Sequence, residues 1–125
     1  MGKTVLIVDD SRTIRQQVTF TLKKGGFEVI EASDGVEGLD RLKEHGPNIG
    51  MVISDVNMPN MDGIEMVETI GADATLKGHN FPIIMLTTEG SSELVNRAKK
   101  AGAKGWLVKP FEPDVLISAA KKFLE

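Results

Sequence analysis

The chain has 125 residues, and 41% of them are hydrophobic, which is enough to fill the core of one compact domain. Its 18 acidic and 15 basic residues give a formal net charge of -3, so the chain lacks the excess of Lys and Arg that nucleic-acid binding requires. The absence of cysteine excludes disulfide bonds and thiolate metal sites, and the N-terminal apolar run over residues 5–8 is too short to insert into a membrane.

Short runs of branched apolar residues alternate along the chain with longer segments of helical periodicity. Apolar residues recur every four positions over Ser11–Lys24, which predicts a first helix that Ser11 caps and that ends at Gly25 and Gly26. Gly102 is expected to end the fourth helix. In chain order we predict strand 4–8, helix 11–24, strand 28–32, helix 36–44, strand 51–54, helix 63–70, strand 82–86, helix 92–101, strand 105–108 and helix 113–124.

This alternation predicts a parallel sheet, because a right-handed helical crossover is the usual connection between neighbouring parallel strands. The continuous apolar run over residues 5–8 suits a strand that is buried on both faces. The polar stretch Gly71–Asn80 is predicted to be a loop between the third helix and the fourth strand. We therefore assign the chain to the α/β class, with helices on both faces of a parallel sheet.

Four of the five predicted strands are followed by polar residues with candidate chemistry. Ligands bind outside the carboxyl ends of the strands in such sheets, so these residues are candidates for one site. They are Asp9 and Asp10 after the first strand, Asp55 after the third, Thr87 and Thr88 after the fourth, and Lys109 and Pro110 after the fifth. Each alone has a structural explanation, such as helix capping by Asp or turn formation by Pro, but together they form a chemically coherent set.

Three crowded carboxylates repel one another unless a cation neutralises them, and an all-oxygen set suits a hard ion such as Mg2+. A carboxylate beside that ion can act as a nucleophile toward phosphorus, while Lys and hydroxyl groups stabilise the phosphoryl oxygens. The candidate site therefore has the parts needed for phosphoryl transfer.

Four segments, VLIVDDS, VISDVNMPNMDG, IIMLTTE and GWLVKPF, resemble the diagnostic segments of response-regulator receiver domains. The resemblance spans nearly the whole chain and is strongest to the chemotaxis regulators. It implies a flavodoxin-like (βα)5 fold with strand order 2-1-3-4-5. It also implies that residues 1–125 form a single receiver domain without an output domain.

The resemblance implies a role for each residue of the acidic set. Asp55 becomes the phosphoacceptor. Asp10 and Asp55 become direct ligands of Mg2+, with Mn2+ as a substitute, while Asp9 contacts the metal through water. The backbone carbonyl of Asn57 completes the protein ligands.

Further roles are implied for the residues around this set. Lys109 would pair with Asp55 or its phosphoryl group, and Thr87 would bind a phosphoryl oxygen and draw its loop inward. A cis peptide bond is expected between Lys109 and Pro110. Gly63 would shape the start of the third helix.

Asn57 and Glu89 occupy positions that tune the lifetime of the phosphoryl group in this family, although Glu89 is equally well explained as an exposed loop carboxylate. Trp106 stands where the family usually has Tyr or Phe as an aromatic that swings inward. It is either a switch residue or a fixed packing residue. Thr88 replaces a smaller residue and is expected to restrict access to the phosphoryl site.

We therefore expect a cytoplasmic, monomeric signalling protein rather than an enzyme, one that catalyses only its own phosphorylation and dephosphorylation. The implied partners are a histidine kinase of the chemotaxis type and an output protein, such as the flagellar motor switch, which binds the face formed by the fourth helix, fifth strand and fifth helix. A phosphate sink and a receiver cut from a longer regulator remain alternatives.

A phosphatase of the haloacid-dehalogenase type also uses an Asp nucleophile, Mg2+ and Lys. Its hallmark places a second Asp two residues after the nucleophile. Here Asn57 follows Asp55 at that spacing and Ser11 follows Asp9, which argues against this alternative.

Overall fold

The computed structural model describes residues 4–88 and 90–124, which form five strands and five α-helices in strict alternation. The strands are β1 (Thr4–Val8), β2 (Glu28–Ala32), β3 (Ile49–Ser54), β4 (Ile83–Thr87) and β5 (Gly105–Val108). The helices are α1 (Arg12–Lys24), α2 (Gly35–His45), α3 (Gly63–Ala72), α4 (Ser92–Ala101) and α5 (Pro113–Leu124). Two short 3-10 helices, η1 (Gly46–Asn48) and η2 (Lys77–His79), follow α2 and precede β4.

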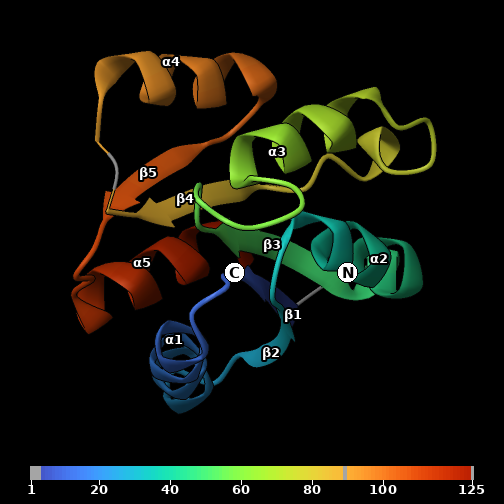
Figure 1. Ribbon diagram of the computed structural model, residues 1–125. Helices are drawn as coiled ribbons and strands as arrows, with labels where there is room; N and C mark the ends of the chain where they lie inside the picture. The colour runs from blue at the N-terminus through green and yellow to red at the C-terminus, as the bar shows by residue number, and fades with distance from the viewer. Residues whose placement is uncertain (1–3, 89, 125) are drawn as a thin grey trace.

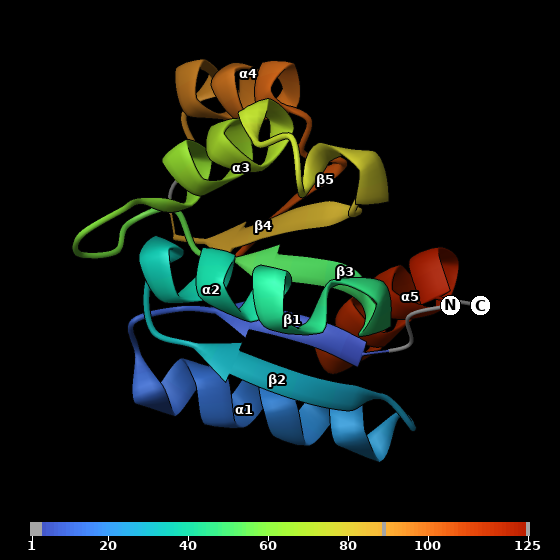
Figure 2. The same ribbon diagram turned by 90° about the vertical axis from the view of Figure 1, so that its right-hand side faces the viewer.

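All five strands lie in one parallel sheet of order β2-β1-β3-β4-β5, which confirms the flavodoxin-like α/β fold (Figure 1). Helices α1 and α5 pack together against one face of the sheet, and α2, α3 and α4 cover the other (Figure 2). The three inner strands are therefore covered on both faces, as the apolar run in β1 predicted.

The sheet separates two apolar clusters. One joins Leu39 and Leu42 of α2 to Ile64 and Val67 of α3, and the other joins α1 to α5 through residues that include Leu116. Because successive residues of a strand point to opposite faces, the inner strands contribute to both clusters. No helix within the described residues is long and apolar enough to cross a membrane.

Three strands and two helices have the predicted bounds, and the others differ by one or two residues at one or both ends. β4 begins at Ile83 rather than at Pro82, which has no backbone N–H to donate to a neighbouring strand. α2 begins at Gly35 because the Asp34 carboxylate accepts the N–H of Glu37 as an N-cap. β3 begins two residues earlier than predicted, at Ile49.

The loop predicted over residues 71–80 is partly wrong. α3 continues to Ala72, and the segment that follows contains η2. Leu76 anchors this segment because its side chain is buried in the cluster beneath α2 and α3. Two predicted helix caps are confirmed: Ser11 caps α1, and Gly102 ends α4 in the left-handed conformation with a φ of 118°.

Candidate functional site

The carboxyl ends of β1, β3, β4 and β5 bring the candidate residues to one edge of the sheet. Asp9 follows β1, Asp55 follows β3, Thr87 is the last residue of β4, and Lys109 follows β5. Asp55 is fixed next to β1 because its N–H donates to the carbonyl of Val8 at 2.9 Å. The sheet order itself therefore assembles the site.

Three carboxylates form its centre. One oxygen each from Asp9, Asp10 and Asp55 can be chosen so that all three atoms lie within 4.8 Å of one another. Asp9 and Asp55 are only 3% and 9% exposed, whereas Asp10 faces solvent. These hard oxygen atoms belong to two buried residues and one exposed residue. They could bind a metal ion that prefers carboxylate and water ligands.

Lys109 links the two buried carboxylates. Its Nζ donates to Oδ2 of Asp9 at 2.7 Å and to Oδ2 of Asp55 at 3.0 Å. Its side chain is 10% exposed, so both contacts are shielded from bulk solvent. An ammonium in this position can neutralise the carboxylates or an anion that binds between them.

Burial raises the pKa of Asp9, and the negative charge of Asp55 adds to that rise, while the hydrogen bonds from Lys109 and Ser11 oppose it. Burial acting alone would lower the pKa of Lys109, but its hydrogen bonds to Asp9 and Asp55 outweigh burial, so that pKa is raised. The Asp9 shift is therefore mainly an effect of burial, whereas the Lys109 shift reflects its two carboxylate partners. Lys109 therefore stays protonated, and the cluster favours a further cation.

The backbone around Asp55 is held from both sides. Oδ1 of Asp55 accepts the N–H of Val56 at 2.7 Å, and the N–H of Gly63 donates to the carbonyl of Val56 at 2.8 Å. A Cβ atom on Gly63 would lie 2.0 Å from the carbonyl oxygen of Asp55, closer than any real contact. Only glycine therefore allows α3 to begin this close to Asp55.

The loop between β3 and α3 is tied to the start of α2. Asn60, in the left-handed conformation with a φ of 67°, donates from Nδ2 to Oδ2 of Asp34 at 2.7 Å. The N–H of Gly35 also donates to the carbonyl of Met61 at 3.2 Å. Asn57, which is exposed, lies in this loop two residues after Asp55.

The remaining predicted residues lie around the cluster. Thr87 is fully buried at the end of β4, and Thr88 beyond it is exposed. Trp106 of β5 lies opposite Met85 of β4 and packs, partly buried, against the core cluster on the side of α3 and α4. The Lys109–Pro110 peptide bond is cis, as expected. Glu89 lies outside the described residues.

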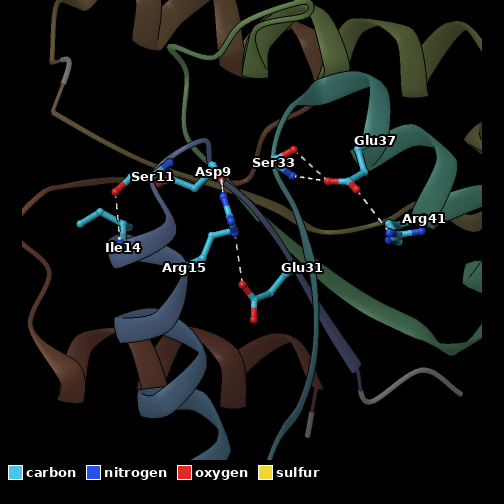
Figure 3. Close-up of polar contacts among 8 residues, drawn as sticks. All are labelled: Asp9, Ser11, Ile14, Arg15, Glu31, Ser33, Glu37 and Arg41. Atoms are coloured by element: carbon cyan, nitrogen blue, oxygen red, sulfur yellow. Dashed lines mark hydrogen bonds and ion pairs between the residues drawn. The ribbon is translucent and has the colours of Figure 1, made fainter.

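The sequence analysis missed Arg15 of α1. Its Nη1 donates to the backbone carbonyl of Asp9 at 2.6 Å, and its Nε donates to Oε1 of Glu31 in β2 at 3.2 Å (Figure 3). The available signal was its position one turn inside the first helix, because long helical side chains lean toward the helix N-terminus. Nothing in the sequence identifies a backbone carbonyl as the partner of a particular Arg.

Comparison with known proteins gives a consistent result. Residues 5–121 match the family described as Response regulator receiver domain. Chemotaxis protein CheY1 of Helicobacter pylori is 42% identical over 113 residues, which cover 90% of this chain and 89% of that protein. A chemotaxis protein CheY homolog of Campylobacter jejuni is 43% identical over 90% of this chain and 85% of that protein.

Solved structures agree with the sequence matches. The chemotaxis protein CheY4 of Vibrio cholerae superimposes with a TM-score of 0.87 at 44% identity, over 99% of this chain and 100% of that chain. The CheX-CheY-BeF3-Mg+2 complex from Borrelia burgdorferi contains a chain with a TM-score of 0.86 at 36% identity, over 98% of this chain and 90% of that chain.

Proposed function

The chain belongs to the response regulator receiver domain family and is a CheY-like signalling protein of two-component chemotaxis rather than a classical enzyme, and from this premise we propose that Asp55 accepts a phosphoryl group from a histidine kinase. The acidic cluster of Asp9, Asp10 and Asp55 is consistent with such a site. The phosphatase alternative is set aside, because the family match covers the chain from residue 5 to residue 121.

One observation carries the proposal. The carboxylate of Asp55 is fixed through Oδ1 by the N–H of Val56 and through Oδ2 by Lys109, beside two further carboxylates. A nucleophile held at both oxygens is restricted in orientation before its reaction partner arrives, which reduces the entropy lost on reaching the transition state. The open side of the site, at Asp10, is where that partner can approach.

We propose that Asp9, Asp10 and Asp55, with the backbone carbonyl of Asn57, hold Mg2+. The three carboxylates fit this ion because they offer only hard oxygen atoms and leave room for water or a phosphoryl oxygen. When bound, Mg2+ supplies charge neutralisation between the carboxylates and the incoming phosphoryl oxygens. Mn2+ accepts the same ligands and is the expected substitute.

In the proposed reaction, a carboxylate oxygen of Asp55 forms a bond to phosphorus as the P–N bond to the donor histidine breaks. The imidazole takes up a proton from solvent and leaves as the neutral ring, and Asp55 becomes an acyl phosphate. Lys109 stays an ammonium throughout and neutralises charge on the phosphoryl oxygens. Hydrolysis of the acyl phosphate by water returns Asp55 to its carboxylate and releases phosphate.

Other roles extend the same proposal. The hydroxyl of Thr87 binds a phosphoryl oxygen and changes the position of the loop after β4, and Trp106 responds to that change. Asn57 and Glu89 tune the lifetime of the acyl phosphate. Phosphorylation need only shift an existing equilibrium by contacts that one state makes better than the other.

For partners, we propose a histidine kinase of the chemotaxis type as phosphodonor and an output protein, such as a flagellar motor switch, that binds the face formed by α4, β5 and α5. The likeness to CheY proteins of two bacteria supports this proposal. A structural relative from Borrelia burgdorferi was solved with CheX, which supports direct binding of partner proteins by receivers of this kind.

Intact-mass spectrometry after incubation with acetyl phosphate and Mg2+ tests the proposal. We expect the mass of one phosphoryl group to be added to the wild type and to Asp114→Ala, an exposed substitution on α5 that serves as a control. No adduct is expected with Asp55→Ala or without divalent metal. An adduct that persists in Asp55→Ala would refute the assignment of the phosphoacceptor.

A further inference from the structure

Arg15 is the one cation besides Lys109 whose side chain hydrogen-bonds a residue of the acidic cluster within residues 4–88 and 90–124. Its contact is to the backbone rather than to a carboxylate. Nη1 donates to the carbonyl oxygen of Asp9 at 2.6 Å, a short charge-assisted hydrogen bond. The guanidinium therefore holds the main chain from which the first two acidic residues extend.

The geometry of α1 explains how Arg15 reaches this carbonyl. Ser11 caps the helix, and the N–H of Arg15 makes the helical hydrogen bond back to the carbonyl of Ser11 at 2.9 Å. A long side chain at this position leans toward the N-terminus of its helix, which here is the turn that contains Asp9 and Asp10. The contact follows from the helix direction.

A second contact fixes Arg15 in turn. Its Nε donates to Oε1 of Glu31 at 3.2 Å, and Glu31 lies in β2, next to β1 (Figure 3). The Arg15 side chain is only 17% exposed, whereas that of Glu31 is 41% exposed. The guanidinium is thus clamped between β2 and the chain segment that leaves β1.

The Asp9 backbone needs this support because the sheet ends there. Its N–H still donates to the carbonyl of Ala32 at 3.1 Å, the last ladder contact between β1 and β2. Its carbonyl has passed the end of the ladder and is bonded by Arg15 instead. Its carboxylate accepts the N–H of Ser11 at 2.9 Å, so the orientation of the peptide groups determines where the carboxylates point.

We propose that Arg15, held by Glu31, is a positioning residue that fixes the Asp9–Asp10 main chain so that both carboxylates face Asp55, and that it thereby sets the affinity of the site for Mg2+. The inference rests on the proposed function, because it assumes that these carboxylates bind the metal. Arg15 acts through Asp9 and touches neither the metal nor the phosphoryl group.

The direction in which the Mg2+ affinity changes when Arg15 is removed distinguishes a positioning role from a purely electrostatic one. Removal of a nearby positive charge would by itself strengthen cation binding. Loss of positioning weakens it, on the order of 10-fold for groups that orient metal ligands. Weaker Mg2+ binding on loss of a positive charge is therefore the signature of a positioning role.

Isothermal titration of the whole chain with Mg2+ provides the test. Arg15→Met is compared with Arg12→Met, a matched change on an Arg of the same helix that is exposed to solvent. We expect Arg15→Met to raise the Kd for Mg2+ about 10-fold and Arg12→Met to leave it unchanged or lower it. Circular dichroism verifies that each variant folds.

Two further variants guard against a folding defect in Arg15→Met. Arg15→Lys keeps the charge but cannot make both contacts, so it is also expected to weaken binding. Glu31→Ala is expected to weaken Mg2+ binding more when Arg15 is present than in the Arg15→Met background, because Glu31 acts through Arg15. Equal effects of Glu31→Ala in the two backgrounds would contradict the clamp.

The kinetic readout is the Mg2+ concentration that gives half-maximal phosphorylation of Asp55 by acetyl phosphate. It should rise in Arg15→Met with little change in the maximal rate. If the wild type binds Mg2+ and is phosphorylated while Arg15→Met has an equal or lower Kd, the inference alone is overturned. If the wild type neither binds Mg2+ nor is phosphorylated, the proposed function fails and the inference fails with it.

Discussion

Gly63→Ala tests whether the start of α3 must lie against Asp55. The new Cβ would be 2.0 Å from the carbonyl oxygen of Asp55 and 2.9 Å from Cε of Met85, so α3 must move away. That movement stretches the 2.8 Å hydrogen bond from Gly63 to Val56, which contributes about 1 kcal/mol. Overpacking of this kind costs about 1–3 kcal/mol.

The expected loss from these two effects is about 2–4 kcal/mol, and the higher helix propensity of Ala returns at most about 1 kcal/mol. Urea unfolding measures the difference. The net loss is then about 1–4 kcal/mol, and with a slope of about 1–3 kcal/mol per molar urea the midpoint should fall by about 0.3–4 M. Phosphorylation of Asp55 should also slow, because the clash is with the main chain of the nucleophile itself.

Gly71→Ala is the matched control. Gly71 lies in the last turn of the same helix, and the nearest atom to a Cβ there is the carbonyl oxygen of Ala101 at 3.8 Å. This substitution should be neutral or stabilise the protein by about 0.5–1 kcal/mol. If Gly63→Ala and Gly71→Ala had the same midpoint, the reasoning from close approach would be refuted.

Three further predictions follow from the site. Lys109→Met should lower the melting temperature in the absence of metal, because the buried carboxylates lose their counter-ion. In the same thermal scan, Mg2+ should stabilise this variant more than it stabilises the wild type. The hydrogen bonds from Glu37 N–H and Asn60 lower the pKa of Asp34 from 3.8, so its stabilising effect is complete above that value and is lost as the pH falls through the lower folded-state pKa. Asp34→Ala should therefore lower the free energy of unfolding by about 1 kcal/mol near neutral pH. Measured by urea unfolding, the free energy of unfolding should also fall less steeply in this variant as the pH decreases through the acidic range, and an unchanged fall would contradict the N-cap role of Asp34. The fluorescence emission of Trp106 should change when acetyl phosphate and Mg2+ are added to the wild type, but not when they are added to Asp55→Ala. Constant emission in the wild type would make Trp106 a fixed packing residue.

The order of elements could be predicted from the sequence because each signal is local. Apolar periodicity, the Ser11 cap and Gly102 act within a few residues, and the structure confirms all three. The strand order came from resemblance, since alternation alone allows several parallel arrangements. The extension of α3 to Ala72 was missed because the polar composition of residues 71–80 predicts one loop, although Leu76 within them is buried in the core.

The acidic cluster could be predicted for the same topological reason. Carboxyl ends of parallel strands share an edge, so residues after β1, β3 and β5 were expected to converge, and Asp9, Asp55 and Lys109 do lie in contact. The contacts of Arg15 to Asp9 and of Asn60 to Asp34 could not be predicted. Each depends on the reach of a side chain across a gap that only the folded chain defines.

The distances around Lys109 indicate how the site could respond to phosphorylation. In this structure the shorter contact is to Asp9, at 2.7 Å, and the longer one is to Asp55, at 3.0 Å. A phosphoryl group on Asp55 adds negative charge beside the same ammonium. Because charge-assisted hydrogen bonds to such a group are strong, we expect Lys109 to shift away from Asp9. Asp9 would then depend more on the N–H of Ser11 and on the metal, and the support of its backbone by Arg15 would matter most in the phosphorylated state.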